Sequence, residues 1–337
     1  MKSRVNTKRS PANQASKPGP VPLQTLPRGL FGGPQMANVN AMGRRPQPLP
    51  TEILQASRGV AGPRLKALFS AMSSAQVYAK TAPTEPVVKH SRIEGATPGC
   101  YAIEVSDTEY HNSVPGISST GLKQLMRSAA HFRAWRDNRH NDSTPARRFG
   151  QAVHCKLLEP HTFDSRYTVY RGGSRRGGSY RDFKLRNANR TILSVEEMDR
   201  VEGCVSSLLE TPGFPLRGYL EGAKDADGEW LVKPARKEFT ILWTDEETGV
   251  LCKVRLDAIG SDPVIAFDAK TCGDARPADF TREIAGMNYD LQAAYYMEGV
   301  RRFFGRDGAF IFGAVEALAP HGALFYVLGP DHDFMAN

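Results

Sequence analysis

The hydrophobic and polar positions of residues 101–337 predict helices first and strands afterwards. Polar caps followed by apolar residues at helical spacing predict helices that begin at Ser118, at Thr144 and at Ser194. Pro145 after Thr144 suits the first helical position. Ser194 and Glu197 form a capping-box pattern, and their helix should run to about residue 210. Between these helices, residues 171–190 are basic and rich in glycine, which predicts a mobile loop.

Five apolar runs in the second half of the chain predict strands, at residues 238–243, 250–257, 264–270, 309–315 and 323–328. Turn residues separate the first three runs, so these should form an antiparallel meander. A helical pattern over residues 280–304 stands between the third and fourth runs. The order predicts an α/β protein with an α+β mixed sheet, in which helices flank a central sheet.

Residues 1–100 differ from the rest of the chain in composition. They hold 13 of the 23 prolines, and they carry 14 basic against 3 acidic residues, whereas residues 101–337 carry 30 basic and 33 acidic residues. Such a segment buries too little apolar surface to offset its ordering entropy, which predicts a disordered tail followed by one domain over residues 101–337. A basic tail binds nucleic acid or an acidic partner, or is simply solvated.

The remaining composition excludes several classes of protein. The five cysteines are scattered and form no C-x-x-C pair, which argues against a disulfide framework, a zinc site and an iron–sulfur cluster. No stretch approaches the ~20 apolar residues of a membrane span. The N-terminus has basic residues but no apolar segment behind them, so we expect no secretory signal, no membrane contact and a cytoplasmic location.

The candidate chemistry lies on two predicted strands. Asp257 ends one strand, and Asp268 and Lys270 lie two apart on the next, so both project to one face. A short turn would bring Asp257 beside Asp268. Two carboxylates bind Mg²⁺ readily, and a lysine beside them could orient or deprotonate a water or neutralise developing charge. This set suits metal-assisted phosphodiester hydrolysis, although an Asp-x-Lys pattern on a strand is also common on solvated faces.

The helix that follows carries Tyr289, Gln292 and Tyr296 on one face. A glutamine there could hydrogen-bond a phosphate oxygen or hold a metal-bound water, and tyrosines could stack on bases or donate to phosphates. The alternative is that both tyrosines simply pack on the sheet. On the helix opened by Thr144, His154 follows Gly150 by one turn, and the glycine would admit a close neighbour. A lone histidine is more often structural than a ligand.

Over about 220 residues the chain resembles the PD-(D/E)xK nuclease superfamily, and within it the exodeoxyribonuclease VIII (RecE-like) group of phages and prophages. The resemblance rests on motifs in a shared order: Tyr110-His111 with Gly116-Ile117-Ser118, Arg148-Phe149-Gly150 with His154, Phe239 to Trp243, Arg255-x-Asp257, Asp268-x-Lys270-Thr271, Tyr289-x-x-Gln292 with Tyr296, and Phe310 to Glu316. Leu256 stands where the superfamily name has proline. Relatives usually continue into a C-terminal helix after the last strand, and we expect this helix to be missing here.

The resemblance implies a Mg²⁺-dependent exonuclease, with Mn²⁺ as an alternative ion, that digests double-stranded DNA from its ends 5′ to 3′. It also implies a ring-like homo-oligomer, a single-strand annealing recombination protein as partner, and a bacterial or phage-infected cell. Its pattern makes His154, Asp257, Asp268 and the Ala269 carbonyl metal ligands, and has Lys270 act on the attacking water. Gln292 and Tyr296 would complete the catalytic set, and Glu238 and Tyr289 would be accessory.

DNA would be held through phosphate contacts by basic residues of the glycine-rich segment, namely Arg171, Arg175, Arg176, Arg181, Lys184 and Arg186. Two other functions remain open. One is a noncatalytic DNA-binding or interaction protein on the same fold, although its metal and lysine positions would then be free to change. The other is a structure-specific endonuclease of the same superfamily, which would nick closed circular DNA.

Overall fold

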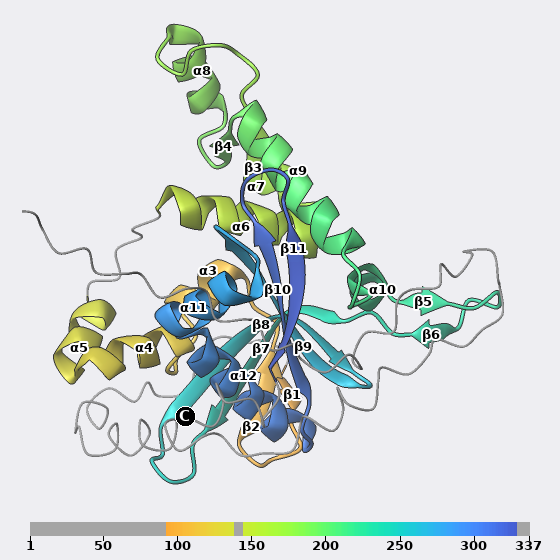
Figure 1. The fold of residues 1–337 in the computed structure, drawn as a ribbon. Helices are drawn as coiled ribbons and strands as arrows, with labels where there is room; N and C mark the ends of the chain where they lie inside the picture. The colour runs from red at the N-terminus through yellow and green to blue at the C-terminus, as the bar shows by residue number, and fades with distance from the viewer. Residues whose placement is uncertain (1–91, 138–143, 329–337) are drawn as a thin grey trace, which may run out of the picture. The chain divides into compact units, whose positions relative to one another are not determined.

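The computed structural model describes residues 92–137 and 144–328, all within one unit of residues 45–337 (Figure 1). The predicted tail therefore lies outside the described residues, except for residues 92–100. These include a strand of the sheet, so the boundary predicted at residue 101 falls too late. Whether a C-terminal helix follows the last strand is likewise outside the described residues.

A seven-stranded mixed sheet forms the centre of the fold, in the order β1-β2-β7-β8-β9-β10-β11. Its strands are β1 (Arg92–Glu94), β2 (Cys100–Ile103), β7 (Arg236–Thr244), β8 (Leu251–Ser261), β9 (Val264–Cys272), β10 (Ala309–Glu316) and β11 (Ala323–Leu328). Strands β7, β8 and β9 form the predicted antiparallel meander, whereas β10 pairs with β9 in parallel. The predicted mixed sheet and all five of its predicted strands are confirmed, and only some strand ends differ.

The parallel pair needs a crossover, which two helices provide. They are α11 (Pro277–Met287) and α12 (Tyr289–Phe304), where the pattern predicted one helix over residues 280–304. Asn288 between them adopts the left-handed conformation, with φ 51° and ψ 48°. Asparagine tolerates this conformation better than most residues, so a single residue ends one helix and starts the next. The break lies next to the candidate residues of α12.

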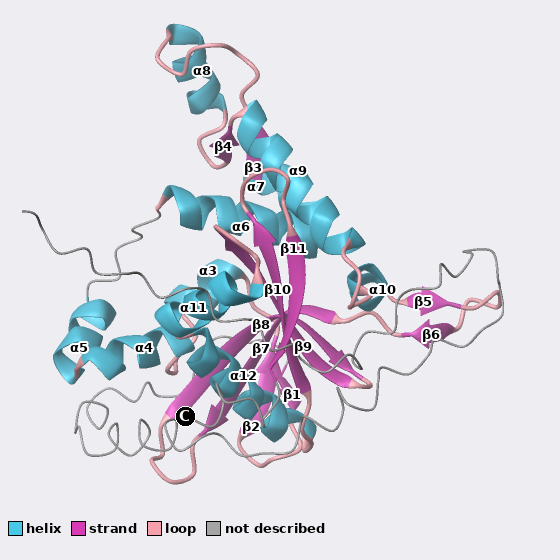
Figure 2. Ribbon diagram, viewed as in Figure 1, coloured by secondary structure: helices cyan, strands magenta, loops and turns pink. Residues whose placement is uncertain are grey.

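Helices cover both faces of the sheet, as Figure 2 shows. On one face α6 (Pro145–Leu158) and α9 (Val195–Glu210) pack on β9 and β10, and on the other α4 (Ser119–Arg127), α11 and α12 join a second core cluster. The predicted caps of these helices are confirmed. Thr144 accepts a hydrogen bond from the Arg147 amide, and Ser194 and Glu197 form the capping box.

Shorter elements surround this core: α3 (Asp107–Asn112), α5 (Ala129–Asp137), α7 (Pro160–Arg166), α10 (Leu216–Glu221), the parallel pair β3 (Tyr167–Val169) and β4 (Thr191–Leu193), and the hairpin β5 (Ala223–Lys224) and β6 (Trp230–Val232). No helix within residues 92–137 and 144–328 is long and apolar enough to cross a membrane.

The mobile loop predicted over residues 171–190 is wrong in its second half, which forms helix α8 (Gly178–Arg186). The reason is an aromatic cluster that the glycines obscure. Tyr180 and Phe183, three residues apart and so on one face of the helix, pack on Tyr170 with ring centroids 5.0 and 5.1 Å away. Figure 1 shows α8 beside the end of α9 that is farther from the sheet.

Candidate functional site

The candidate site lies where strands β8 and β9 separate. Their ladder ends at the pair Ala258–Phe267, one step before Asp257 and Asp268. Here the Asp257 carboxylate replaces a strand partner, since its Oδ2 accepts a hydrogen bond of 2.9 Å from the Ala269 amide. The two aspartates therefore meet as predicted. Asp257 is not the end of its strand, however, because β8 continues four residues beyond it, and these four are the residues that pair with β9.

The Asp268 carboxylate is buried and held through both of its oxygens. Its Oδ1 accepts a hydrogen bond of 2.9 Å from the Gln292 amide, and its Oδ2 is ion-paired with the Lys270 ammonium. Only 2% of Asp268 and 8% of Gln292 is exposed. Gln292 lies on α12, so the predicted link between this helix and the strand is present in the structure. Lys123 of α4 donates in turn to Gln292 Oε1 at 3.4 Å.

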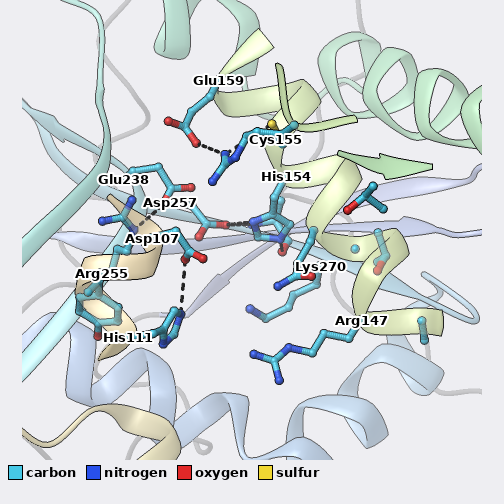
Figure 3. Close-up of a pocket in the computed structure, with 18 of the residues that line it drawn as sticks. Asp107, His111, Arg147, His154, Cys155, Glu159, Glu238, Arg255, Asp257 and Lys270 are labelled. Atoms are coloured by element: carbon cyan, nitrogen blue, oxygen red, sulfur yellow. Dashed lines mark hydrogen bonds and ion pairs between the residues drawn. The ribbon is translucent and has the colours of Figure 1, made fainter. Parts of the chain in front are cut away.

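We call the point where β8 and β9 separate, beside Asp257 and Asp268, the fork. His154 joins α6 to this fork, as Figure 3 shows. Its Nδ1 lies 3.2 Å from Asp257 Oδ2, and its Nε2 donates to the Ala269 carbonyl at 2.7 Å. The helix can come this close because of Gly150, where a Cβ atom would meet the Thr271 hydroxyl at 3.2 Å. The close approach predicted from this glycine is thus observed, and both ring nitrogens of His154 face oxygen atoms.

Crowding of these charges shifts their pKa values. Burial raises the pKa of Asp257 to about 7; the nearby Asp268 adds to this, whereas His154 and Lys270 oppose it. Burial alone would lower the pKa of Lys270, but its two aspartate neighbours outweigh burial and raise it. For Lys123 the balance is the opposite, because burial together with repulsion by Lys270 outweighs the attraction of Asp268 and Asp290 and lowers its pKa to about 8.

The two tyrosines of α12 pack on the sheet, as the structural alternative predicted, and they also line the pocket. Tyr289 packs on Phe312 and Tyr296 on Phe310, with ring centroids 5.8 and 6.2 Å apart, so both support the sheet. Both also line the pocket above the fork. The Lys270 ammonium lies 4.8 Å from the centre of the Tyr289 ring, a cation–π distance.

The pocket has a volume of about 980 Å³ and takes its walls from α6, β8, β9, α11 and α12. Glu238 lies in it, but its carboxylate accepts a hydrogen bond of 2.6 Å from Arg255. The backbone of Glu238 is in the left-handed region, with φ 52°, which is strained for a residue other than glycine. The sequence did not indicate Lys123, which donates to Gln292 from 169 positions away along the chain. It also did not indicate Arg147, which lines the pocket. No local pattern marks either residue.

One comparison with known proteins identifies the family of the chain. Residues 118–337 match a family described as a PDDEXK-like domain of unknown function (DUF3799). The chain belongs to this PD-(D/E)xK-like family. A crystal structure from Eubacterium rectale, described as a "putative exonuclease", resembles the chain at 12% identity and a TM-score of 0.46, over 69% of this chain and 80% of the other. Among curated proteins no match is found.

The PD-(D/E)xK-like site has donors that suit a hard divalent cation. Two carboxylates, a backbone carbonyl and an imidazole are oxygen and nitrogen ligands of the kind that Mg²⁺ and Mn²⁺ accept. Asp268 Oδ2 is buried and is ion-paired with the Lys270 ammonium, so a positive charge already faces the atom that would bind an ion. In the part of the chain described, no three His, Cys, Asp or Glu side chains are already gathered around one point. Lys270 and His154 instead neutralise the two aspartates.

The predicted DNA-binding residues lie between β3 and β4, and none of the six lines the pocket of the PD-(D/E)xK-like site. Three of them, Arg175, Arg181 and Lys184, line a second pocket of about 680 Å³ beside α8. Arg171, Arg176 and Arg186 line neither of these two pockets. The structure therefore divides the six predicted residues into three that line the second pocket and three that line neither pocket.

Proposed function

We propose that this chain is a divalent-metal-dependent exodeoxyribonuclease of the RecE-like type, which digests duplex DNA 5′ to 3′ and leaves a 3′ single strand for an annealing partner. The observation that supports it best is the fork of β8 and β9, where Asp257, Asp268 and Lys270 meet Gln292 from α12. The polarity, the ring-like oligomer and the annealing partner rest on the sequence resemblance.

Asp257, Asp268, the Ala269 carbonyl and His154 would hold the cation. When bound, Mg²⁺ or Mn²⁺ would polarise the scissile phosphate and make a bound water more acidic. For His154 to take part, its Nε2 would have to release the Ala269 carbonyl, to which it now donates. That exchange frees the carbonyl as well, so one small movement of the ring would uncover two ligands.

Lys270 would orient the attacking water and neutralise charge on the phosphate. Its aspartate neighbours raise its pKa, which keeps the ammonium protonated and makes it a poor base. Water supplies the oxygen that forms the new bond to phosphorus, and the bond to the leaving sugar oxygen breaks. Gln292 holds the Asp268 carboxylate in place through its amide. Tyr289 and Tyr296, on the pocket wall, would contact the sugar–phosphate chain or a base.

The test uses the full chain, a linear duplex with 5′-phosphates and a closed circular duplex, with Mg²⁺ or with EDTA. We expect metal-dependent loss of the linear duplex alone, abolished by Asp268→Ala and by Lys270→Ala. Asp199→Ala, the same change on the exposed face of α9, is the control and should cleave normally. Cleavage by Asp268→Ala would show that the site is wrongly assigned.

Two other results would replace the proposal. Nicking of the closed circle would identify an endonuclease of the same superfamily, since an exonuclease needs an end. Binding of DNA without cleavage in any metal would identify a noncatalytic DNA-binding protein on this fold. Labelling the 5′ or the 3′ end of the linear duplex gives the polarity in the same experiment.

A further inference from the structure

A second pocket, of about 680 Å³, lies beside helix α8 and is strongly basic. Its walls come from the first turns of α6, from α8, from β4 and from the start of α9. The basic residues that line it are Arg148, Arg175, Arg181, Lys184 and Arg190, and the acidic residue is Glu197. Five positive charges therefore face one negative charge across this pocket.

Few of these charges are neutralised within the protein. Glu197 pairs with Arg175 at 3.1 Å, and it also accepts a hydrogen bond from the backbone at the start of α9. Arg190 donates to the Asp164 carbonyl at 3.1 Å. The other three, Arg148, Arg181 and Lys184, have no carboxylate within ion-pair distance in residues 92–137 and 144–328, and all three are exposed.

Helix electrostatics explain only part of this pattern. Lys184 lies in the last turn of α8, where a positive charge is stabilised by the helix dipole. Arg148 is the opposite case, because it lies near the start of α6, whose first turn has no acidic residue. A cation there is repelled by the positive end of the helix dipole. Attraction to Glu197 opposes this repulsion, and a bound anion would oppose it further.

The pocket is built on a well-packed support. Tyr170, Tyr180 and Phe183 form the aromatic cluster that fastens α8 to β3. The buried side chain of Asn187 donates to the Phe183 carbonyl at 2.8 Å and closes the C-terminal end of the helix. The cations of α8 thus extend from a fixed helix, and the half-buried Tyr180 adds an aromatic face to the pocket wall.

The basic pocket adjoins the pocket of the proposed active site. Thr191 lines both. At the start of α6, Arg147 lines the active-site pocket and its neighbour Arg148 lines the basic one. Two consecutive arginines therefore serve two adjoining pockets, which suits a ligand with repeated negative charges that extends from one into the other.

We propose that the basic pocket binds the phosphates of the same DNA duplex whose end enters the active site. This inference rests on the proposed function for the identity of the duplex, and it assigns phosphate contacts to Arg148, Arg181 and Lys184. Of the six basic residues expected from the sequence to bind DNA, the inference retains Arg181 and Lys184. It adds Arg148, which lies on a different helix, α6.

The test is the salt dependence of binding by the full chain to a linear duplex in EDTA, where cleavage is stopped. The variant replaces Arg148, Arg181 and Lys184 by glutamine. Each phosphate contact contributes about 0.9 to the slope of log affinity against log salt, so the slope should fall by about 2.7. Between 50 and 200 mM salt the wild-type chain should then lose about 40-fold more affinity than the variant.

A control variant changes the same net charge elsewhere, through Arg217→Gln, Lys224→Gln and Lys233→Gln, all exposed and outside both pockets. Its slope should stay close to that of the wild type. An unchanged slope in the pocket variant would overturn the inference, and so would an equal fall in both variants, because that would reflect net charge alone.

Cleavage separates this inference from the proposed function. At low salt the pocket variant should need more DNA than the wild-type chain to reach half of its own maximal cleavage rate. If the wild-type chain cleaves and the variant has an unchanged DNA requirement, only the inference fails. If the wild-type chain cleaves no DNA, the proposed function fails, while the loss of salt slope still tests the pocket.

Discussion

Asp257 makes the fork of β8 and β9 less stable at neutral pH, and Asp257→Asn should therefore stabilise the metal-free protein. The carboxyl group has a pKa of 3.8 without burial and about 7 in the folded protein. Above pH 7 the folded state must ionise a group that resists ionisation. A shift of about 3 pKa units corresponds to about 4 kcal/mol.

The substitution also removes a favourable contact. Asparagine can still accept the hydrogen bond of the Ala269 amide, but it lacks the charge that faces His154 at 3.2 Å. The attraction of His154 is already included in the pKa of about 7, so the loss to subtract is roughly 1–3 kcal/mol for a buried amide donor of asparagine without a partner, which leaves a gain of roughly 1–3 kcal/mol. For a protein of this size, that gain should raise the melting temperature by about 2–10 °C at pH 8.

The pH dependence of the stability difference tests whether the ionisation of Asp257 is its cause. Because the folded pKa is raised, the stability of the wild-type protein is complete below about pH 4 and falls as the pH rises through about 7. The advantage of Asp257→Asn should therefore be absent near pH 4, grow between pH 4 and 7, and stay constant above pH 7. Thermal unfolding in EDTA across this range measures it, with Asp199→Asn on the exposed face of α9 as control. A pH-independent difference, or a less stable variant at pH 8, would refute the reasoning.

Other changes test the packing that carries the site. Gly299→Ala should lower the free energy of unfolding by about 1–3 kcal/mol, because its Cβ atom would lie 2.8 Å from the Trp243 ring. Gly286→Ala, in the neighbouring helix with no atom within 4 Å, should instead raise it by about 0.5–1 kcal/mol in the same denaturation assay. Lys253→Met should lower it by about 2 kcal/mol or more, since the buried ammonium donates to two backbone carbonyls at 2.6 and 2.7 Å; an unchanged midpoint would show that water replaces the ammonium.

Local patterns predicted the elements well, and contacts between distant residues poorly. Apolar runs and turn residues were enough for the meander, and the capping signals of Thr144 and Ser194 marked true helix starts. The break at Asn288 was missed because the apolar pattern continues through it, while the left-handed conformation depends on one residue. Helix α8 was missed because glycines and arginines suggested a loop, and its partner Tyr170 lies before them in the chain.

The candidate site shows the same division. Asp257, Asp268 and Lys270 could be placed together because strand pairing has simple geometry, and Gln292 followed from helical spacing. Lys123 could not be found in this way. It reaches Gln292 only through the packing of α4 against α12, which no periodicity along the chain encodes. The ion pair of Glu238 with Arg255 was likewise not predicted, because it depends on the strained backbone of the glutamate.

The fork also explains how the end of one strand pairing can bury a carboxylate among other charges. Strand β9 leaves β8 after the Ala258–Phe267 pair and continues beside β10, so the backbone of β8 has no ladder partner on that side. The Asp257 carboxylate occupies the gap, and this places a charge inside the sheet, where burial raises its pKa. The same geometry that weakens the folded state thus provides a carboxylate ready to bind a cation. Binding of that cation should remove the penalty, so Mg²⁺ should stabilise the wild-type protein more than it stabilises Asp257→Asn.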